Sequence, residues 1–402
     1  MCKMEIGMKN TMKKYHQTIY ASYLGYITQA IVNNLAPLLF LIFMNQFGFS
    51  LRQITAITTI NFAIQLIVDF LSAKFIDRIG YRISVVFAHV FAVLGLIGMG
   101  TLPFVVPNAY IGLLIAVFLY AIGGGLIEVL ISPIVEACPS DHKAAAMSLL
   151  HSFYCWGTVA VVGLSTVFLE IAGKDRWRWL TLFWAVLPAL NAIWFTRVPI
   201  ERLTEDGEGM TIGDLVKSKL FWLFVVLMIA AGASEQGMSQ WASAFAESGL
   251  HVSKFLGDLA GPCFFSILMG LARAFYGKYG ERINLLKFIM GSAVLCIFAY
   301  GLASFSPNPV VALLGCGICG LSVGIMWPGV FSLASERMPK GGTALFALLA
   351  LGGDVGCGSG PTVVGFVSDL FGGVLQKGLF FAVIFPIIML LFSMLLKRTK
   401  ND

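Results

Sequence analysis

Twelve long stretches of this sequence are almost entirely apolar, and each is long enough to cross a membrane as a helix. A membrane-spanning helix needs roughly 20 consecutive, mostly apolar residues. The stretches cover residues 16–43, 53–76, 83–103, 109–133, 143–170, 178–197, 219–246, 254–278, 285–304, 309–336, 342–371 and 376–396. Because 58% of the residues are hydrophobic and only 12% are charged, a water-soluble fold would have too little polar surface. We therefore predict an all-α integral membrane protein with twelve transmembrane helices.

The lysines and arginines are distributed unevenly between the two sides of this arrangement. All but six of the 27 fall on one side; the exceptions are Arg52, Lys174, Arg176, Arg178, Lys254 and Lys377. Loops with the excess of positive charge stay in the cytoplasm, so we predict that both termini are cytoplasmic. The sequence has no Asn-x-Ser/Thr acceptor, which favours a bacterial inner membrane. Topology and lipid contact account for the net charge of +6, so no nucleic-acid partner is expected.

The second half of the sequence repeats features of the first half at an offset of 200 residues. The coincidences pair Gly80 with Gly280, Arg82 with Arg282, Gly124 with Gly324, Glu136 with Glu336 and Pro139 with Pro339. Duplicated bundles of this kind are typical of secondary transporters. We predict one six-helix bundle at residues 1–197, a cytoplasmic linker at 198–218 and a second six-helix bundle at 219–402.

A charged motif follows the second apolar stretch. It contains Asp77, Arg78, Gly80 and Arg82, and it has Ala73 at its start. The glycine permits a tight turn, and the charged groups can form strong hydrogen bonds that hold one conformation. The motif resembles the loop between the second and third helices of the major facilitator superfamily, with Ala73 in place of the usual glycine. The resemblance implies two pseudo-symmetric six-helix bundles and a role for this motif in conformational gating; a purely topogenic charge cluster is the alternative.

Four ionisable residues lie well inside predicted spans. They are Glu128, His151, Glu235 and Asp354. A charged side chain at the centre of a bilayer costs roughly 2.5–3.5 kcal/mol on insertion scales, so such residues are candidates for function by default. Burial in a pair or in a neutral state would lower that cost, and a structural role remains the alternative.

Glu128 is the first candidate for proton coupling. Gly124 and Ser132 share its helix face at four-residue spacing, and small residues there leave space for a ligand or a close helix. The segment resembles the fourth helix of the fucose permease branch, the fucose:proton symporters, with Ser132 in place of an asparagine. In that branch the glutamate belongs to the sugar and proton site, so the resemblance implies the same role for Glu128. A purely structural buried acid is the other interpretation.

Three further segments are similar to the same branch. Asn33 and Asn34 match an Asn-Asn-Leu pattern in its first helix, although Pro37 stands where the branch has an aspartate. The segment around His151 resembles a Leu-His-aromatic-Gly pattern in the fifth helix. Glu235 and Trp241 match a seventh-helix pattern of Glu and Trp six residues apart.

The polar and aromatic residues of these segments suit a sugar. Hydroxyl groups need donor and acceptor side chains, and the apolar face of a pyranose favours an aromatic ring. The expected substrate-binding residues are Asn33, Asn34, Glu128, His151, Glu235, Gln236, Gln240, Trp241 and Trp327. Bonds between helices for the amides and His151, and lipid or interfacial packing for the tryptophans, are the competing interpretations.

Other charged residues are assigned to gating or to coupling. Asp69, Glu136, Arg273 and Glu336 lie near predicted cytoplasmic helix ends, where charge pairs can open and close with the transport cycle. Asp354 lies in a glycine-rich segment of the eleventh span. That segment follows no strand, so it is not a nucleotide-binding loop. Its glycines are expected to let the helix pack closely, with Asp354 facing a cavity.

These observations predict a secondary active transporter of a small polar solute, a sugar by the resemblance, that works by alternating access in symport with protons. The proton-coupling candidates are Glu128, Glu235 and Asp354. The expected partners are the solute, protons and the lipid bilayer, with a monomeric chain, no cofactor, no metal and no enzymatic activity. The alternatives are a drug:proton efflux antiporter of the same superfamily, and a membrane solute sensor that does not transport.

Overall fold

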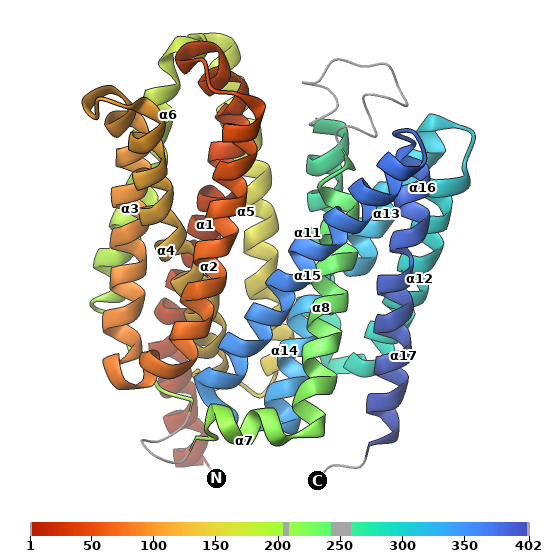
Figure 1. Ribbon diagram of the computed structural model, residues 1–402. Helices are drawn as coiled ribbons and strands as arrows, with labels where there is room; N and C mark the ends of the chain where they lie inside the picture. The colour runs from red at the N-terminus through yellow and green to blue at the C-terminus, as the bar shows by residue number, and fades with distance from the viewer. Residues whose placement is uncertain (1, 204–208, 243–258, 400–402) are drawn as a thin grey trace. The chain divides into compact units, whose positions relative to one another are not determined.

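The computed structural model describes residues 2–203, 209–242 and 259–399, and every regular element within them is a helix. The first half contains α1 (Cys2–Phe47), α2 (Leu51–Ile79), α3 (Tyr81–Val105), α4 (Ala109–Ala137), α5 (Lys143–Ala172) and α6 (Trp177–Phe195). The second half contains α7 (Ile212–Lys217), α8 (Lys219–Ser239), α11 (Phe264–Tyr279), α12 (Leu285–Phe305), α13 (Pro309–Val323), α14 (Met326–Arg337), α15 (Gly342–Leu370), α16 (Leu375–Ala382) and α17 (Ile384–Arg398) (Figure 1).

Ten helical segments of the described part are long and apolar enough to cross a membrane. They coincide with ten of the predicted spans, and α1 and α11 occupy the other two positions. The predicted all-helical membrane architecture is therefore confirmed, and twelve spans are consistent with it. The predicted spans 219–246 and 254–278 run partly through residues 243–258, which lie outside the described residues, as does Lys254.

Local signals set where several helices begin. Ser50 accepts a hydrogen bond from the backbone N–H of Gln53, whose side chain accepts one in return from the N–H of Ser50; this capping box starts α2. Asn108 caps α4 through its side-chain oxygen. In the segment before α8, the hydroxyl and backbone N–H of Thr211 donate to Asp214, and these bonds lower the pKa of that carboxyl group.

Prolines interrupt two of the spans that the sequence predicts as continuous. The tenth span breaks between α13 and α14, and the twelfth breaks between α16 and α17. A proline ring clashes with the carbonyl of the residue four positions earlier and lacks an N–H to bond it. Those residues are Gly324 for Pro328 and Ala382 for Pro386, so each break lies where proline removes the helical bond.

The chain forms two compact units. The first comprises Met1–Asp141 and Trp156–Gly209, and the second comprises His142–Cys155 and Met210–Asp402. The polar linker that the sequence predicts at 198–218 stays a prediction, because residues 204–208 lie outside the described part. In the first unit α3 packs along α4 at glycines: a Cβ added at Gly95 would lie 2.4 Å from the backbone nitrogen of Tyr120.

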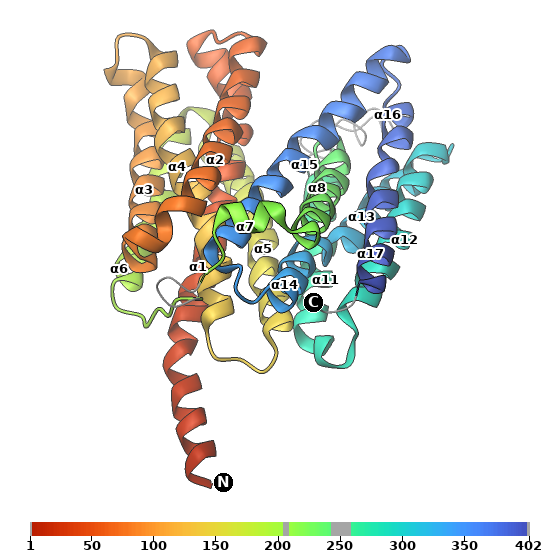
Figure 2. The same cartoon turned by 60° about the horizontal axis from the view of Figure 1, so that its bottom comes forward.

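In the second unit α8 and α15 pack backbone against backbone, side by side in both views (Figures 1 and 2). A Cβ added at Gly356 would lie 2.2 Å from the carbonyl oxygen of Ile229, and one at Gly360 would lie 2.4 Å from that of Ala233. Only glycine permits such an approach. The close packing predicted for the glycine-rich segment is therefore confirmed.

Helix α5 divides between the two units, and its residues up to Cys155 pack in the second. The hydroxyl of Ser148 donates to the carbonyl oxygen of Arg273 in α11 over 2.8 Å. One turn further along α11, a Cβ at Gly277 would lie 2.9 Å from Leu149. The N-terminal half of α5 thus lies directly on α11.

Candidate functional site

A chain of amide side chains leads to Glu128 in the first unit. Nε2 of Gln29 in α1 donates to Oε2 of Glu128 in α4 over 3.0 Å, and it lies 3.5 Å from Oε1 of Gln65 in α2. Nε2 of Gln65 donates to Oδ1 of Asn33 over 3.0 Å. Gln29 and Gln65 are buried, whereas Asn33 and Glu128 are half-buried. Three helices therefore contribute to one connected polar group.

Gly124 makes room for this group one turn before Glu128. A Cβ there would lie 3.3 Å from Oε1 of Gln29 and 3.4 Å from Nε2 of Gln65. Sequence reasoning identified Gly124, Asn33 and Glu128 but missed the two glutamines. A signal existed in α2, where Asn61, Gln65 and Asp69 recur every four residues in an apolar span.

Two polar residues near this group, Asn34 and Ser132, form hydrogen bonds to other helices. Nδ2 of Asn34 donates to the carbonyl oxygen of Ala30 over 2.8 Å and to the hydroxyl of Thr158 over 3.3 Å. Ser132 is bonded to the hydroxyl of Tyr26 over 2.8 Å. For Asn34 these contacts match the interhelical alternative that the sequence left open.

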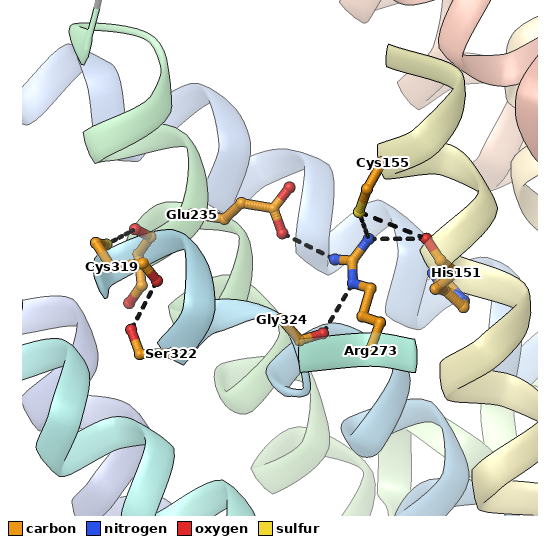
Figure 3. A network of polar contacts seen from close by, with 8 residues as sticks. His151, Cys155, Glu235, Arg273, Cys319, Ser322 and Gly324 are labelled. Carbon is orange, nitrogen blue, oxygen red and sulfur yellow. Dashed lines mark hydrogen bonds and ion pairs between the residues drawn. The ribbon is translucent and has the colours of Figure 1, made fainter. Parts of the chain in front are cut away.

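The second unit contains a buried guanidinium with partners on three elements (Figure 3). Nη2 of Arg273 forms an ion pair with Oε2 of Glu235 over 3.2 Å. Nε of Arg273 donates to the carbonyl oxygen of Gly324 over 2.8 Å. Nη1 donates to the carbonyl oxygen of His151 over 3.1 Å and to Sγ of Cys155 over 3.2 Å. Arg273 thereby connects α8, α5 and the break before α14 to α11.

This network joins residues for which the sequence predicts different roles. Glu235 is a predicted coupling and binding residue, whereas Arg273 is predicted to gate. The carbonyl of Gly324 is available to Arg273 because Pro328 cannot bond it. No local sequence pattern predicts this last contact, because it combines a missing helical bond with an arginine 51 positions away.

His151 enters the network through its main chain. Its carbonyl oxygen accepts from Arg273, and its ring is buried at 6.0 Å from the ring of Phe331. A direct role of the imidazole in binding stays a prediction.

The remaining predicted binding residues of this unit lie in or directly after α8 and in α14, and the coupling candidate Asp354 lies in α15. Trp327 is buried and covers Gly353, where a Cβ would lie 2.1 Å from its ring. Asp354, the next residue, is also buried. Nε1 of Trp241 donates to the carbonyl oxygen of Pro361 over 3.2 Å. Gln236 is half-buried and Gln240 is exposed at the end of α8.

The predicted gating residues lie in different environments. Gly80 joins α2 to α3 with φ of +94°, a conformation that glycine adopts without strain. Nη1 of Arg82 donates to the carbonyl oxygens of Phe195 and Thr196 over 3.0 Å and 2.8 Å, so Arg82 caps α6. Asp77, Arg78 and Glu336 are exposed, whereas Asp69 and Glu136 are buried.

Comparison with known proteins gives a family and a fold. A family model described as Major Facilitator Superfamily matches residues 22–361. Membrane protein MosC of Rhizobium meliloti is 23% identical over 300 residues, which are 75% of this chain and 72% of that protein. A gentisate transporter of Corynebacterium glutamicum is 25% identical over 159 residues, which are 37% of this chain and 34% of that protein.

Solved structures share the fold at low identity. The E. coli fucose:proton symporter FucP has a TM-score of 0.80 at 14% identity, with 96% of this chain and 100% of that chain covered. The proton:xylose symporter XylE has a TM-score of 0.78 at 14% identity, with 96% of each chain covered. At such identities the similarity concerns the fold, and it confirms the architecture predicted from the sequence.

Proposed function

We propose that this chain, which belongs to the major facilitator superfamily, is a secondary active transporter that carries a small polar solute in symport with protons by alternating access. We place it in a bacterial inner membrane with both termini in the cytoplasm. The solute class that we favour is a sugar. FucP and XylE are named as symporters of fucose and xylose with protons, and the amide chain of the first unit offers the donors and acceptors that hydroxyl groups need.

The observation that carries the proposal is the bond between Glu128 and Gln29. An acid inside a membrane span is retained at a cost, and proton relays in transporters use such acids. Glu128 is half-buried, so a solute or water can approach it. Gln29 holds the carboxylate by a hydrogen bond and brings no opposite charge to it. We therefore assign proton coupling to Glu128 first.

Glu235 and Asp354 remain as further coupling candidates. Glu235 is held by the guanidinium of Arg273, which balances its charge within the unit. Proton uptake by Glu235 would leave a buried arginine uncompensated, which is costly. Asp354 is buried on the helix that packs against α8. We expect Glu235 to be the less suitable carrier of the two.

Proteoliposomes with an imposed acid-outside gradient test the proposal. The panel of solutes is L-fucose, D-xylose, gentisate and a drug-like cation. We expect uphill accumulation of a sugar by the wild-type protein. Glu128→Gln should abolish accumulation yet keep exchange of labelled for unlabelled sugar, because exchange needs no net proton movement. Glu170→Gln, at an exposed glutamate near the end of α5, is the matched control and should behave as wild type.

Gradient-driven accumulation by Glu128→Gln at the wild-type rate would contradict the coupling role. Efflux of the cation with no sugar uptake would instead support the antiporter alternative. Specific sugar binding with neither uptake nor exchange would support the sensor.

A second candidate solute is an aromatic carboxylate. The similarity to a protein named as a gentisate transporter favours it. Uptake of gentisate without uptake of either sugar in the same assay would select this class.

A further inference from the structure

One buried atom of the amide chain has no hydrogen-bond partner among the described residues. It is Oε1 of Gln29, and Gln29 is only 2% exposed. Buried carbonyl oxygens are nearly always hydrogen-bonded, so an orphaned one needs an explanation. The atom lies beside Gly124, which contributes no side chain to bond it.

Glu128 sets the orientation of this amide. The nitrogen of Gln29 faces Oε2 of Glu128 because a carboxylate can only accept hydrogen bonds. A protonated carboxyl group also donates, and it then favours an acceptor at the same place. Rotation of the Gln29 amide exchanges its two ends and brings Oε1, the orphaned acceptor, toward the new donor.

The exchange can continue along the chain. Nε2 of Gln29 lies 3.5 Å from Oε1 of Gln65, and Nε2 of Gln65 donates to Oδ1 of Asn33. Once the Gln29 amide has rotated, its Oε1 faces Oε1 of Gln65, and two acceptors cannot form a hydrogen bond. Rotation of Gln65 removes that conflict and creates the same conflict at Asn33. Asn33 then resolves it by turning its own nitrogen toward Gln65.

We propose that Gln29 and Gln65 are positioning residues that convert the protonation state of Glu128 into the hydrogen-bonding polarity of Asn33. With Glu128 ionised, Asn33 keeps its amide nitrogen for a solute, because Gln65 occupies its oxygen. With Glu128 protonated, Asn33 keeps its oxygen instead. The inference rests on the proposed function, since it gives that transporter a path from proton to solute within one unit.

Other ionisable groups surround α4, and the test must separate them from Glu128. Its neighbours are α1, α2 and α3. The buried ionisable side chains that these helices contribute in the described part are Tyr15, Tyr26, Asp69, Tyr81 and His89, and α4 itself contributes Tyr120 and Glu136. A signal that disappears in Glu128→Gln belongs to Glu128 and to none of these.

The experiment is infrared difference spectroscopy of the full-length protein in lipid bilayers, grown with side-chain-labelled glutamine and titrated from mildly alkaline to mildly acidic pH. We expect a protonated-carboxyl band that is lost in Glu128→Gln. We also expect a labelled-glutamine band that shifts with the same midpoint, and this shift should be absent in Glu128→Gln. A glutamine band that stays still while the Glu128 carboxyl titrates would overturn the proposal.

Gln29→Met interrupts the row of hydrogen-bonded amide side chains and keeps a side chain of similar length. We expect the Glu128 band to remain and the labelled-glutamine shift to be lost, because the labelled Gln29 is absent and Gln65 no longer responds. Should this variant fail to fold, Gln65→Met leaves Gln29 to respond alone and should remove the smaller part of the shift. A full shift in either variant would overturn the relay.

Asn191→Ala is the matched control. Asn191 is an equally buried amide, and its nitrogen bonds Ala21 and His89, which do not belong to the row of amides from Gln29 to Asn33. It should lower the melting temperature and leave both bands as in wild type. These spectra need no solute. A shift of the glutamine band in a protein that accumulates no sugar would therefore reject the proposed function and support the relay. Proton-driven sugar accumulation without a shift of the band would support the proposed function and reject the relay.

Discussion

Arg273 and Glu235 form an ion pair inside the second unit, with Nη2 of one 3.2 Å from Oε2 of the other and side chains only 3% and 11% exposed. The two residues are 38 positions apart and lie on different helices. Their charges cancel where neither could be solvated. The same ion pair therefore stabilises the fold of this unit and balances the charge of Glu235, a predicted functional acid.

Breaking this pair should destabilise the protein strongly. Glu235→Gln leaves the arginine buried without a counter-charge, and loss of one partner of such a pair costs about 3–5 kcal/mol. We expect a large fall in the melting temperature of the purified protein, followed by intrinsic tryptophan fluorescence. The double variant Glu235→Gln, Arg273→Met should recover part of the loss, because no buried charge remains.

An exposed pair in the same unit provides the comparison. His142 and Glu281 lie 3.0 Å apart with side chains about half exposed. Solvent screens such pairs, and their contribution is about 0–1 kcal/mol. Glu281→Gln should leave the melting temperature nearly unchanged; an equal fall in both variants would mean that burial of the Arg273 pair has no special effect.

Glu128→Gln should separate stability from coupling. The glutamine keeps an oxygen that can accept from Gln29, so the fold loses little and the melting temperature stays within a few degrees of wild type. Proton-driven accumulation should be lost. Parallel melting and transport measurements on Glu128→Gln and Glu235→Gln check this contrast: a melting temperature as low for the first variant as for the second would make Glu128 a structural acid.

The glycines of α15 should tolerate substitution according to the face they occupy. Alanine at Gly356 or Gly360 pushes the backbones of α15 and α8 apart, and overpacking of this kind costs about 1–3 kcal/mol. Gly358 lies on the same helix with nothing within 4 Å of an added Cβ. We expect Gly358→Ala to melt at or slightly above the wild-type temperature and the other two variants to melt at lower temperatures. Three indistinguishable variants would show that the close approach is not needed.

Gly80→Ala should be costly for a conformational reason. Residues other than glycine are strained at φ of +94°, by about 1–3 kcal/mol. There is free space around this position, since the nearest side-chain atom to an added Cβ is 3.7 Å away on Arg202. A lowered melting temperature would thus report backbone strain. Gly291→Ala, inside α12 and also in open space, should instead melt at or slightly above the wild-type temperature.

The sequence predicts the helices well because an apolar run of membrane length leaves the backbone no alternative to helical bonding. It also singles out Glu128 and Gly124. A helix that only faces lipid rarely has an acid with a small residue one turn away. Gln29 and Gln65 are harder to recognise. An amide can satisfy itself against many neighbours, so its presence in a span indicates no particular partner.

Contacts between distant helices are the part that sequence reasoning could not reach. The pairing of Arg273 with Glu235 depends on how α11 lies against α8, and no local pattern states it. The break before α14 was predictable in principle, because Pro328 stands four positions after Gly324. What the proline rule does not reveal is that an arginine takes up the released carbonyl.

That released carbonyl makes the tenth span a jointed element. α13 and α14 are two short helices, and the guanidinium of Arg273 donates a hydrogen bond to the carbonyl oxygen of Gly324 between them. A change of tilt between the two helices would stretch no helical bond at Gly324, because proline has already removed it. The second unit can therefore bend at this break without losing a helical hydrogen bond, and the ion pair with Arg273 connects Glu235 to the same position.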